Sequence, residues 1–143
     1  MAGKPLDVQV GEEAAFTKTV TAEDVAALAE ATGDHNPLHL DDAFAARTRF
    51  GQRVAHGVLT TGLISAAVAG HFVKPTVNVI LASASQRYRA PVYLGDTISA
   101  RARVRNFDPG RGLVFLETEC TNQRGETVVT GEVVIMLEPL AES

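Results

Sequence analysis

Cysteine is nearly absent from this chain, which contains a single one, Cys120. One cysteine cannot form an internal disulfide, and it excludes a zinc site built from several cysteine ligands. The sequence also lacks a charged segment followed by an apolar stretch, the pattern of a secretory signal. We therefore expect a protein of the cytoplasm.

Long apolar runs are missing as well. The longest weakly polar stretch, residues 54–70, is 17 residues long and contains a histidine, two threonines, a serine and three glycines. It is too short and too polar to span a membrane, so no membrane association is expected. There is no internal repeat and no Pro/Gly/Ser-rich linker. The 143 residues are therefore expected to form one domain, residues 1–143.

Charge of one sign is unevenly distributed along the chain, although the net charge is only −4. Residues 47–111 carry ten Lys/Arg and two Asp/Glu, whereas the segments on either side are acidic. The basic segment can face an anionic ligand, or it can pair with acidic strands beside it. The overall acidity argues against a nucleic-acid partner.

The first half of the chain has the pattern of short helices. After a short strand near residues 14–20, Thr21 and Asp24 have the spacing of a capping box, and Gly33 can end the helix that follows. Because proline cannot lie inside a helix, Pro37 predicts an irregular loop over residues 32–39. Asp41 or Asp42 can then cap a second short helix that runs to Arg47.

The second half has the pattern of a sheet around one buried helix. Residues 54–70 are apolar nearly all round and predict a buried helix. Strands follow, with strict alternation from Ile98 to Arg105 and turn signals at residues 108–110 and 122–125. Helices followed by antiparallel strands indicate an α+β fold, in which the sheet buries one face on the long helix.

The segment Gly33 to His39 is rich in groups that transfer protons. Asp34 and His39 can share one water molecule, which the carboxylate and the imidazole together can deprotonate, while Pro37 fixes the loop. An ordinary structural role remains open, because Asp34 and Asn36 can simply form turns or caps.

Two further readings of the histidines were considered. His35 and His39 have the i, i+4 spacing of helical metal ligands, but the proline between them argues against a metal. His56 can act as a base or can be a turn residue before Gly57.

Several segments of the chain are similar to the motifs of a known family. Four segments resemble the motifs of (R)-specific enoyl-CoA hydratases of the MaoC-like, or hydratase 2, family: Gly33–His39, Ala55–Leu59, Arg89–Asp96 and Asn122–Glu126. The similarity covers about residues 15–138. It implies a single hot-dog fold and hydration of trans-2-enoyl-CoA to (R)-3-hydroxyacyl-CoA. It also implies an acyl-CoA substrate, no metal, no cofactor, and a homodimer or a dimer of dimers.

The resemblance also implies roles for individual residues. Asp34 and His39 match the family's catalytic pair, and the backbone N–H of Gly57 matches its oxyanion donor. Asn36 and Ser65 match residues near the substrate, where Asn36 holds the loop and Ser65 lies two turns along the central helix. Ser65 can equally be a buried hydroxyl bonded to its own helix.

The arginines allow two interpretations. Arg87 and Arg89 can bind the phosphates of coenzyme A. Alternatively, the arginines of the sheet can pair across strands with acidic residues; these are Arg101, Arg103 and Arg105, opposite Glu117 and Glu119.

Three other functions were weighed. A 3-hydroxyacyl-CoA or acyl-carrier-protein dehydratase would use the same residues in the reverse direction. A hot-dog thioesterase needs a carboxylate on the central helix, and residues 58–70 contain none. A non-catalytic acyl-CoA-binding domain would not need both Asp34 and His39.

Overall fold

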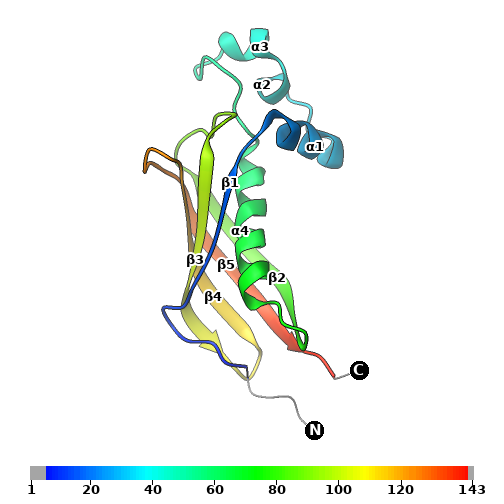
Figure 1. Cartoon of the computed structure of the whole chain (residues 1–143), viewed down its shortest axis with the longest axis vertical. Coiled ribbons are helices and arrows are strands. Elements are labelled where there is room, and N and C mark those ends of the chain that lie inside the picture. Colours follow the sequence, from blue (N-terminus) through cyan, green and yellow to red (C-terminus); the bar gives the residue numbers. More distant parts are fainter. Residues whose placement is uncertain (1–5, 142–143) are drawn as a thin grey trace.

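A five-stranded antiparallel sheet curls along one long helix in the computed structural model, which describes residues 6–141 (Figure 1). The strand order is β1-β3-β4-β5-β2. The elements in chain order are β1 (Glu13–Thr19), α1 (Ala22–Thr32), α2 (Pro37–Leu40), α3 (Asp42–Ala46), α4 (Gly57–Phe72), β2 (Val77–Tyr88), β3 (Thr97–Asp108), β4 (Leu113–Thr121) and β5 (Thr127–Pro139). The predicted α+β class, with an antiparallel sheet around a central helix, is confirmed.

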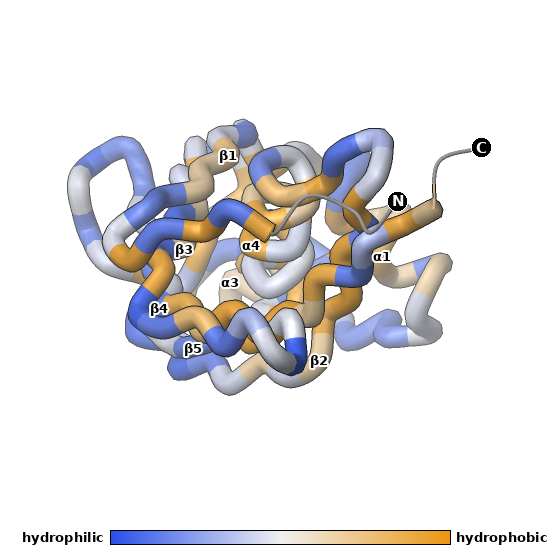
Figure 2. Tube along the Cα trace, turned by 90° about the horizontal axis from the view of Figure 1, so that it is seen from below, coloured by the Kyte–Doolittle hydropathy of each residue, from blue (hydrophilic) through white to orange (hydrophobic). Residues whose placement is uncertain are grey.

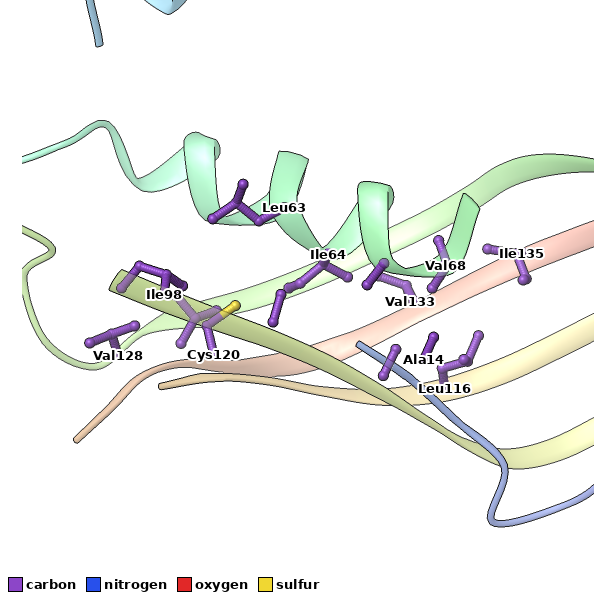
Figure 3. Packing of buried hydrophobic residues seen from close by; sticks show 14 of the residues in the cluster. Ala14, Leu63, Ile64, Val68, Ile98, Leu116, Cys120, Val128, Val133 and Ile135 are labelled. Carbon is purple, nitrogen blue, oxygen red and sulfur yellow. The ribbon is translucent and has the colours of Figure 1, made fainter. Parts of the chain in front are cut away.

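The hydrophobic core lies between α4 and the sheet. Alternate residues of β3 from Ile98 to Val104 are completely buried, as the alternation predicted. Apolar positions alternate with polar ones along the strands (Figure 2). Leu63, Ile64 and Val68 of α4 pack with residues of the sheet in one cluster (Figure 3). The helix therefore holds its position by apolar burial along its length.

Helix α1 begins and ends as the sequence predicts. The Thr21 side chain accepts a hydrogen bond from the Asp24 N–H, and the Asp24 carboxylate accepts one from the Thr21 N–H. Gly33 ends the helix with φ of 83°, a left-handed conformation that glycine adopts without steric cost. This end fixes the point at which the chain leaves the helix toward Asp34.

The expected irregular loop over residues 32–39 is wrong at its second half. Only residues 33–36 are irregular, and Pro37 is the first residue of α2. Proline is tolerated at this position because the first N–H of a helix has no partner within the helix. Asn36 caps α2 by accepting from the Leu38 N–H, and Asp41 then caps α3. His39 therefore lies on a short helix and not in a loop.

Helix α4 begins three residues later than the pattern of residues 54–70 predicts, and it ends at Phe72. Val54 forms an isolated β-bridge with Tyr93, and the Ala55 N–H donates to the Val92 carbonyl. These contacts keep the chain extended until His56, so Gly57 is the first helical residue. The helix consequently starts beside the segment that follows β2.

The buried carboxylate of Asp96 joins two turns of the sheet. The Asp96 side chain accepts hydrogen bonds from the Tyr93 N–H and the Gln123 amide, and it pairs with Arg124. Burial favours the neutral acid, but these three donors outweigh it and hold the pKa of Asp96 below its ordinary value. Asp96 thus ties the turn before β3 to the hairpin between β4 and β5.

The arginines of β3 face acidic residues of β4. Arg105 forms an ion pair with Glu117, and Arg101 and Arg103 lie opposite Glu119 and Glu117 in the register of the two strands. The structural interpretation of these three arginines is therefore supported. Within residues 6–141, no helix combines the length and the apolar character needed to cross a membrane.

Candidate active site

Asp34 lies in a short, tightly hydrogen-bonded loop. Its N–H donates to the Thr32 hydroxyl at 3.1 Å, and its Oδ1 accepts from the Asn36 N–H at 3.2 Å. The second carboxylate oxygen makes no hydrogen bond to the described residues. The open alternative from the sequence was correct in part, because both Asp34 and Asn36 form local caps or turns. Asp34 nevertheless keeps one oxygen available for a ligand.

His39 is buried and held by two bonds. Its Nδ1 lies 2.7 Å from the Val54 carbonyl, and Arg53 Nε donates to the His39 carbonyl at 2.7 Å. Because a carbonyl can only accept, the ring proton resides on Nδ1. In the neutral imidazole, Nε2 then carries a lone pair. His39 is therefore arranged to accept a proton at Nε2.

His56 packs against this histidine. The two ring centroids are 3.9 Å apart and the planes are inclined by 30°. His56 Nε2 lies 3.0 Å from the backbone carbonyl of Asp34, to which it donates. The ring is 2% exposed. The sequence left His56 as a base or a turn residue, and its contact with the other two residues was not predicted.

Asp34, His39 and His56 form one group, in which one polar atom from each side chain lies within 4.8 Å of the others. A single water molecule can bridge acceptors separated by up to about 5 Å, since each hydrogen bond is about 2.8 Å long. Two histidines and a carboxylate are also zinc-ligand types. One nitrogen of each ring, Nδ1 of His39 and Nε2 of His56, is already engaged by a backbone carbonyl. The expected absence of a metal stays a prediction.

Gly57 is the first residue of α4, where helical N–H groups lack partners within the helix. Its N–H donates to no other described residue, and His56 makes no side-chain cap bond. A Cβ at this position would lie 3.0 Å from Cε1 of Tyr88. Glycine therefore allows the Tyr88 ring to approach the helix start, where the helix dipole favours negative charge.

A cavity of about 600 Å³ brings most of these groups together. Its lining includes Asp34, His39, Gly57 and Arg89 of the predicted residues. Asn36, Ser65 and Arg87 do not line it, although Ser65 lies on α4 two turns beyond Gly57. The roles of all seven predicted residues stay predictions, and the structure brings four of them to one cavity.

Several lining residues were missed by the sequence reasoning. Arg49 and Phe50 follow α3, and the Arg49 guanidinium lies 5.8 Å from the centre of the Phe50 ring. Tyr88 and Val58 line the cavity and are about half exposed. An aromatic residue beside an arginine in an otherwise short connection is the signal that could have identified Arg49 and Phe50.

Comparison with known protein families matches residues 7–125 to the MaoC like domain. A 3-hydroxybutyryl-CoA dehydratase from Methylorubrum extorquens is 36% identical over 137 residues, covering 96% of this chain and 85% of the relative. An (R)-specific enoyl-CoA hydratase from Rhodospirillum rubrum is 34% identical, covering 92% of this chain and 89% of the relative.

Solved structures show the same similarity. The unliganded R-hydratase PhaJ1 from Pseudomonas aeruginosa superposes with a TM-score of 0.82 at 37% identity, covering 95% of this chain and 90% of that one. An (R)-hydratase from Aeromonas caviae gives a TM-score of 0.85 at 34% identity, covering 92% and 98%. The similarity thus extends over nearly the whole chain in both sequence and structure.

Proposed function

The chain belongs to the MaoC-like family and has its hot-dog fold, and from this premise we propose that it is an (R)-specific enoyl-CoA hydratase. The reaction adds water across the double bond of a trans-2-enoyl-CoA and gives the (R)-3-hydroxyacyl-CoA. One observation carries the proposal: Asp34, His39 and Gly57, whose N–H has no partner among the described residues, all line the same cavity.

The N-terminus of α4 is suited to the thioester. The Gly57 N–H would donate to the thioester carbonyl oxygen, on which negative charge develops when a nucleophile attacks C3. The partial positive charge of the helix start adds to this stabilisation. Removing one such donor in other enzymes costs about 10²–10³ in rate.

Asp34 and His39 would orient the water. In the resting state both offer acceptor atoms, the free oxygen of Asp34 and Nε2 of His39. A water that donates one hydrogen to each has its lone pairs left for C3 of the substrate. This arrangement would use the carboxylate and the imidazole together.

The step is balanced without any other reactant. The water oxygen forms a bond to C3 as one of its protons passes to the catalytic pair, and the electrons of the double bond move toward the carbonyl held by Gly57. A proton from the pair then returns to C2 as the C=O bond reforms. The pair ends as it began, so the proposed step needs no further reactant.

Dehydration of a 3-hydroxyacyl thioester is the same reaction in reverse. A relative named as a 3-hydroxybutyryl-CoA dehydratase supports this second candidate. The same three groups would serve both directions, because the transition state is shared. The candidates are distinguished by kcat and KM for hydration and for dehydration, each measured on coenzyme A thioesters and on acyl-carrier-protein thioesters.

We propose that coenzyme A lies at the mouth of the cavity. Arg49 and Arg89 both line it and can reach phosphate oxygens. Arg89 also donates to the Thr130 hydroxyl at 3.0 Å, which holds its side chain in place. Arg87 lies next to Tyr88 on β2 and outside the lining, so Arg49 replaces it in this proposal.

We also propose that the protein is a homodimer that pairs through the β2 edge. β2 is the last strand of the sheet, and an unpaired edge of 12 residues is a template for another strand. Ile80, Leu81 and Tyr88 on this strand are 36%, 47% and 53% exposed. A partner there would cover these side chains and add a wall to the cavity.

The test is a hydration assay with crotonyl-CoA and longer 2-enoyl-CoAs, followed by the loss of enoyl-thioester absorbance. Chiral analysis of the product should give the (R) enantiomer. A predominantly (S) product, or no hydration of any enoyl-CoA, contradicts the proposal. Sedimentation at micromolar concentration tests the dimer, and a fully active monomer of 15.2 kDa contradicts it.

A further inference from the structure

We propose that His56 is a positioning residue that locks the Asp34 loop and His39 to the start of α4. The inference rests on the proposed function, because the geometry it maintains is that of the hydration site. It concerns a residue whose side chain the proposed mechanism assigns to no step and which the sequence left open as a base or a turn residue.

A hydrogen bond from His56 connects the Asp34 loop to the start of α4. The bonds of the Asp34 loop to Thr32 and Asn36 are local and leave its position relative to α4 undetermined. His56 Nε2–H donates to the Asp34 carbonyl at 3.0 Å across 22 residues of chain. Since His56 immediately precedes Gly57, this bond sets the distance between the carboxylate and the oxyanion donor.

The His56 ring also contacts the ring of His39. His39 is fixed at Nδ1 by Val54, so its remaining freedom is a tilt about that bond. The His56 ring lies against it at 3.9 Å and limits the tilt. The orientation of His39, which lines the cavity, is thereby maintained, so one side chain constrains both members of the pair.

His56 is also unfavourable for stability in two respects. His56 occupies the N-cap position of α4, where Ser, Thr, Asp or Asn would cap the helix, and it provides no cap bond. Its Nδ1 is buried and has no partner among residues 6–141. A buried polar atom without a partner opposes folding. The side chain is therefore poorly chosen for stability alone, which favours a role in the site.

Two substitutions distinguish a positioning role of His56 from simple packing in the core. Glutamine places its amide nitrogen where histidine has Nε2, so His56→Gln keeps the donor to the Asp34 carbonyl and loses the ring. His56→Phe keeps a ring of similar size and removes the donor. If His56 only fills space, phenylalanine is the better replacement.

The experiment measures kcat and KM with crotonyl-CoA, and the melting temperature, for both variants. We expect His56→Phe to lose about tenfold to a hundredfold in kcat, as a misplaced catalytic group does. KM should change little, and the melting temperature should not fall. His56→Gln keeps the bond but loses the ring contact, so it should lose some kcat, about fivefold at most, and less than His56→Phe.

His71 provides the matched control. It also lies on α4, contacts the Phe72 ring at 4.7 Å and bonds to Glu12, but it is at the opposite end of the helix. His71→Phe and His71→Gln should leave kcat unchanged. If His56→Phe fails to fold, His56→Met removes the donor with a flexible side chain and replaces it in the comparison.

Two results overturn the inference: kcat of the donor-free variant within about threefold of wild type, or His56→Gln losing as much kcat as His56→Phe. A readout without activity separates this from the proposed function. The chain has four histidines, so ring ¹⁵N NMR spectra can be assigned. Wild-type His56 should carry its proton on Nε2. A proton on Nδ1 instead overturns the positioning role, whichever reaction the enzyme catalyses.

Discussion

Asp34 and His39 should behave as one catalytic unit, and the structure allows each to be removed without unfolding the loop. In Asp34→Asn, the amide oxygen can still accept from the Asn36 N–H, so the turn is retained. In His39→Asn, the amide nitrogen takes the place of Nδ1 and can still donate to the Val54 carbonyl. Each substitution thus removes one acceptor for the water and little else.

The magnitude follows from the shared water. Asp34→Asn replaces the free carboxylate oxygen with an amide that donates, so the water can donate to His39 alone and is no longer held at both ends. General acid–base groups contribute about 10²–10⁴ in rate, and the loss in kcat should be in this range. The double variant should lose little more than either single one, because both lose the same water. The remaining rate comes from Gly57 and substrate binding.

The assay is kcat and KM on crotonyl-CoA for the two single variants and the double variant, with circular dichroism to verify folding. His35→Ala is the control, since His35 lies in the same loop but is exposed and bonds to Glu30. Its kcat should change only modestly. If Asp34→Asn keeps more than about a tenth of the wild-type kcat, the mechanism is wrong. If the two single effects multiply, the water is not shared.

Three further outcomes are expected. Gly57→Ala should lower kcat about 10²-fold, measured on crotonyl-CoA, because its Cβ would meet Tyr88 at 3.0 Å and displace the oxyanion donor; an unchanged kcat contradicts that role. Asp96→Ala should lower the free energy of unfolding by about 1.5–3 kcal/mol in urea, since it removes a buried charged acceptor that receives hydrogen bonds from three donors. Because the pKa of Asp96 is lowered in the folded state, its stabilisation is present above the unfolded pKa and is lost as the pH falls through the folded value; a variant as stable as wild type at neutral pH refutes this. Leu81→Asp should give a monomer in sedimentation with reduced activity, and a dimer of normal activity would exclude the β2 edge.

Much of the fold could be predicted because the signals are local. The capping box of Thr21 and the left-handed Gly33 depend on residues three or four apart, and both helix ends are confirmed. The alternation from Ile98 to Val104 reports burial directly, since one face of β3 is completely buried. The residues themselves indicated Asp34 and His39 as a proton-transferring pair, and the family resemblance added Gly57. All three line one cavity, and their roles stay predictions.

The remaining features have an ambiguous local signal or depend on contacts distant in sequence. Pro37 could end a helix or start one, and only the Asn36 cap decides in favour of a start. Helix α4 starts late because Val54 pairs with Tyr93, which is 39 residues away. His56 and Arg49 belong to the site through neighbours from other elements, and neither carries a periodic pattern. The sequence offers only weak signals for them: an aromatic residue beside Arg49, and a motif around His56 that leaves the role of its side chain open.

The position of β1 has a consequence for how the protein folds. β1 pairs only with β3, so that Glu13 lies opposite Arg103, and α1 and the Asp34 loop follow directly after β1. Pairing β1 with β3 closes the long chain segment between these two strands. This step is slow, because the segment loses conformational entropy before the hydrogen bonds of the pair form. We expect β1 to join the sheet late in refolding. The Asp34 loop would then reach α4 last, so recovery of enzymatic turnover would lag behind recovery of helical signal and report completion of the native state.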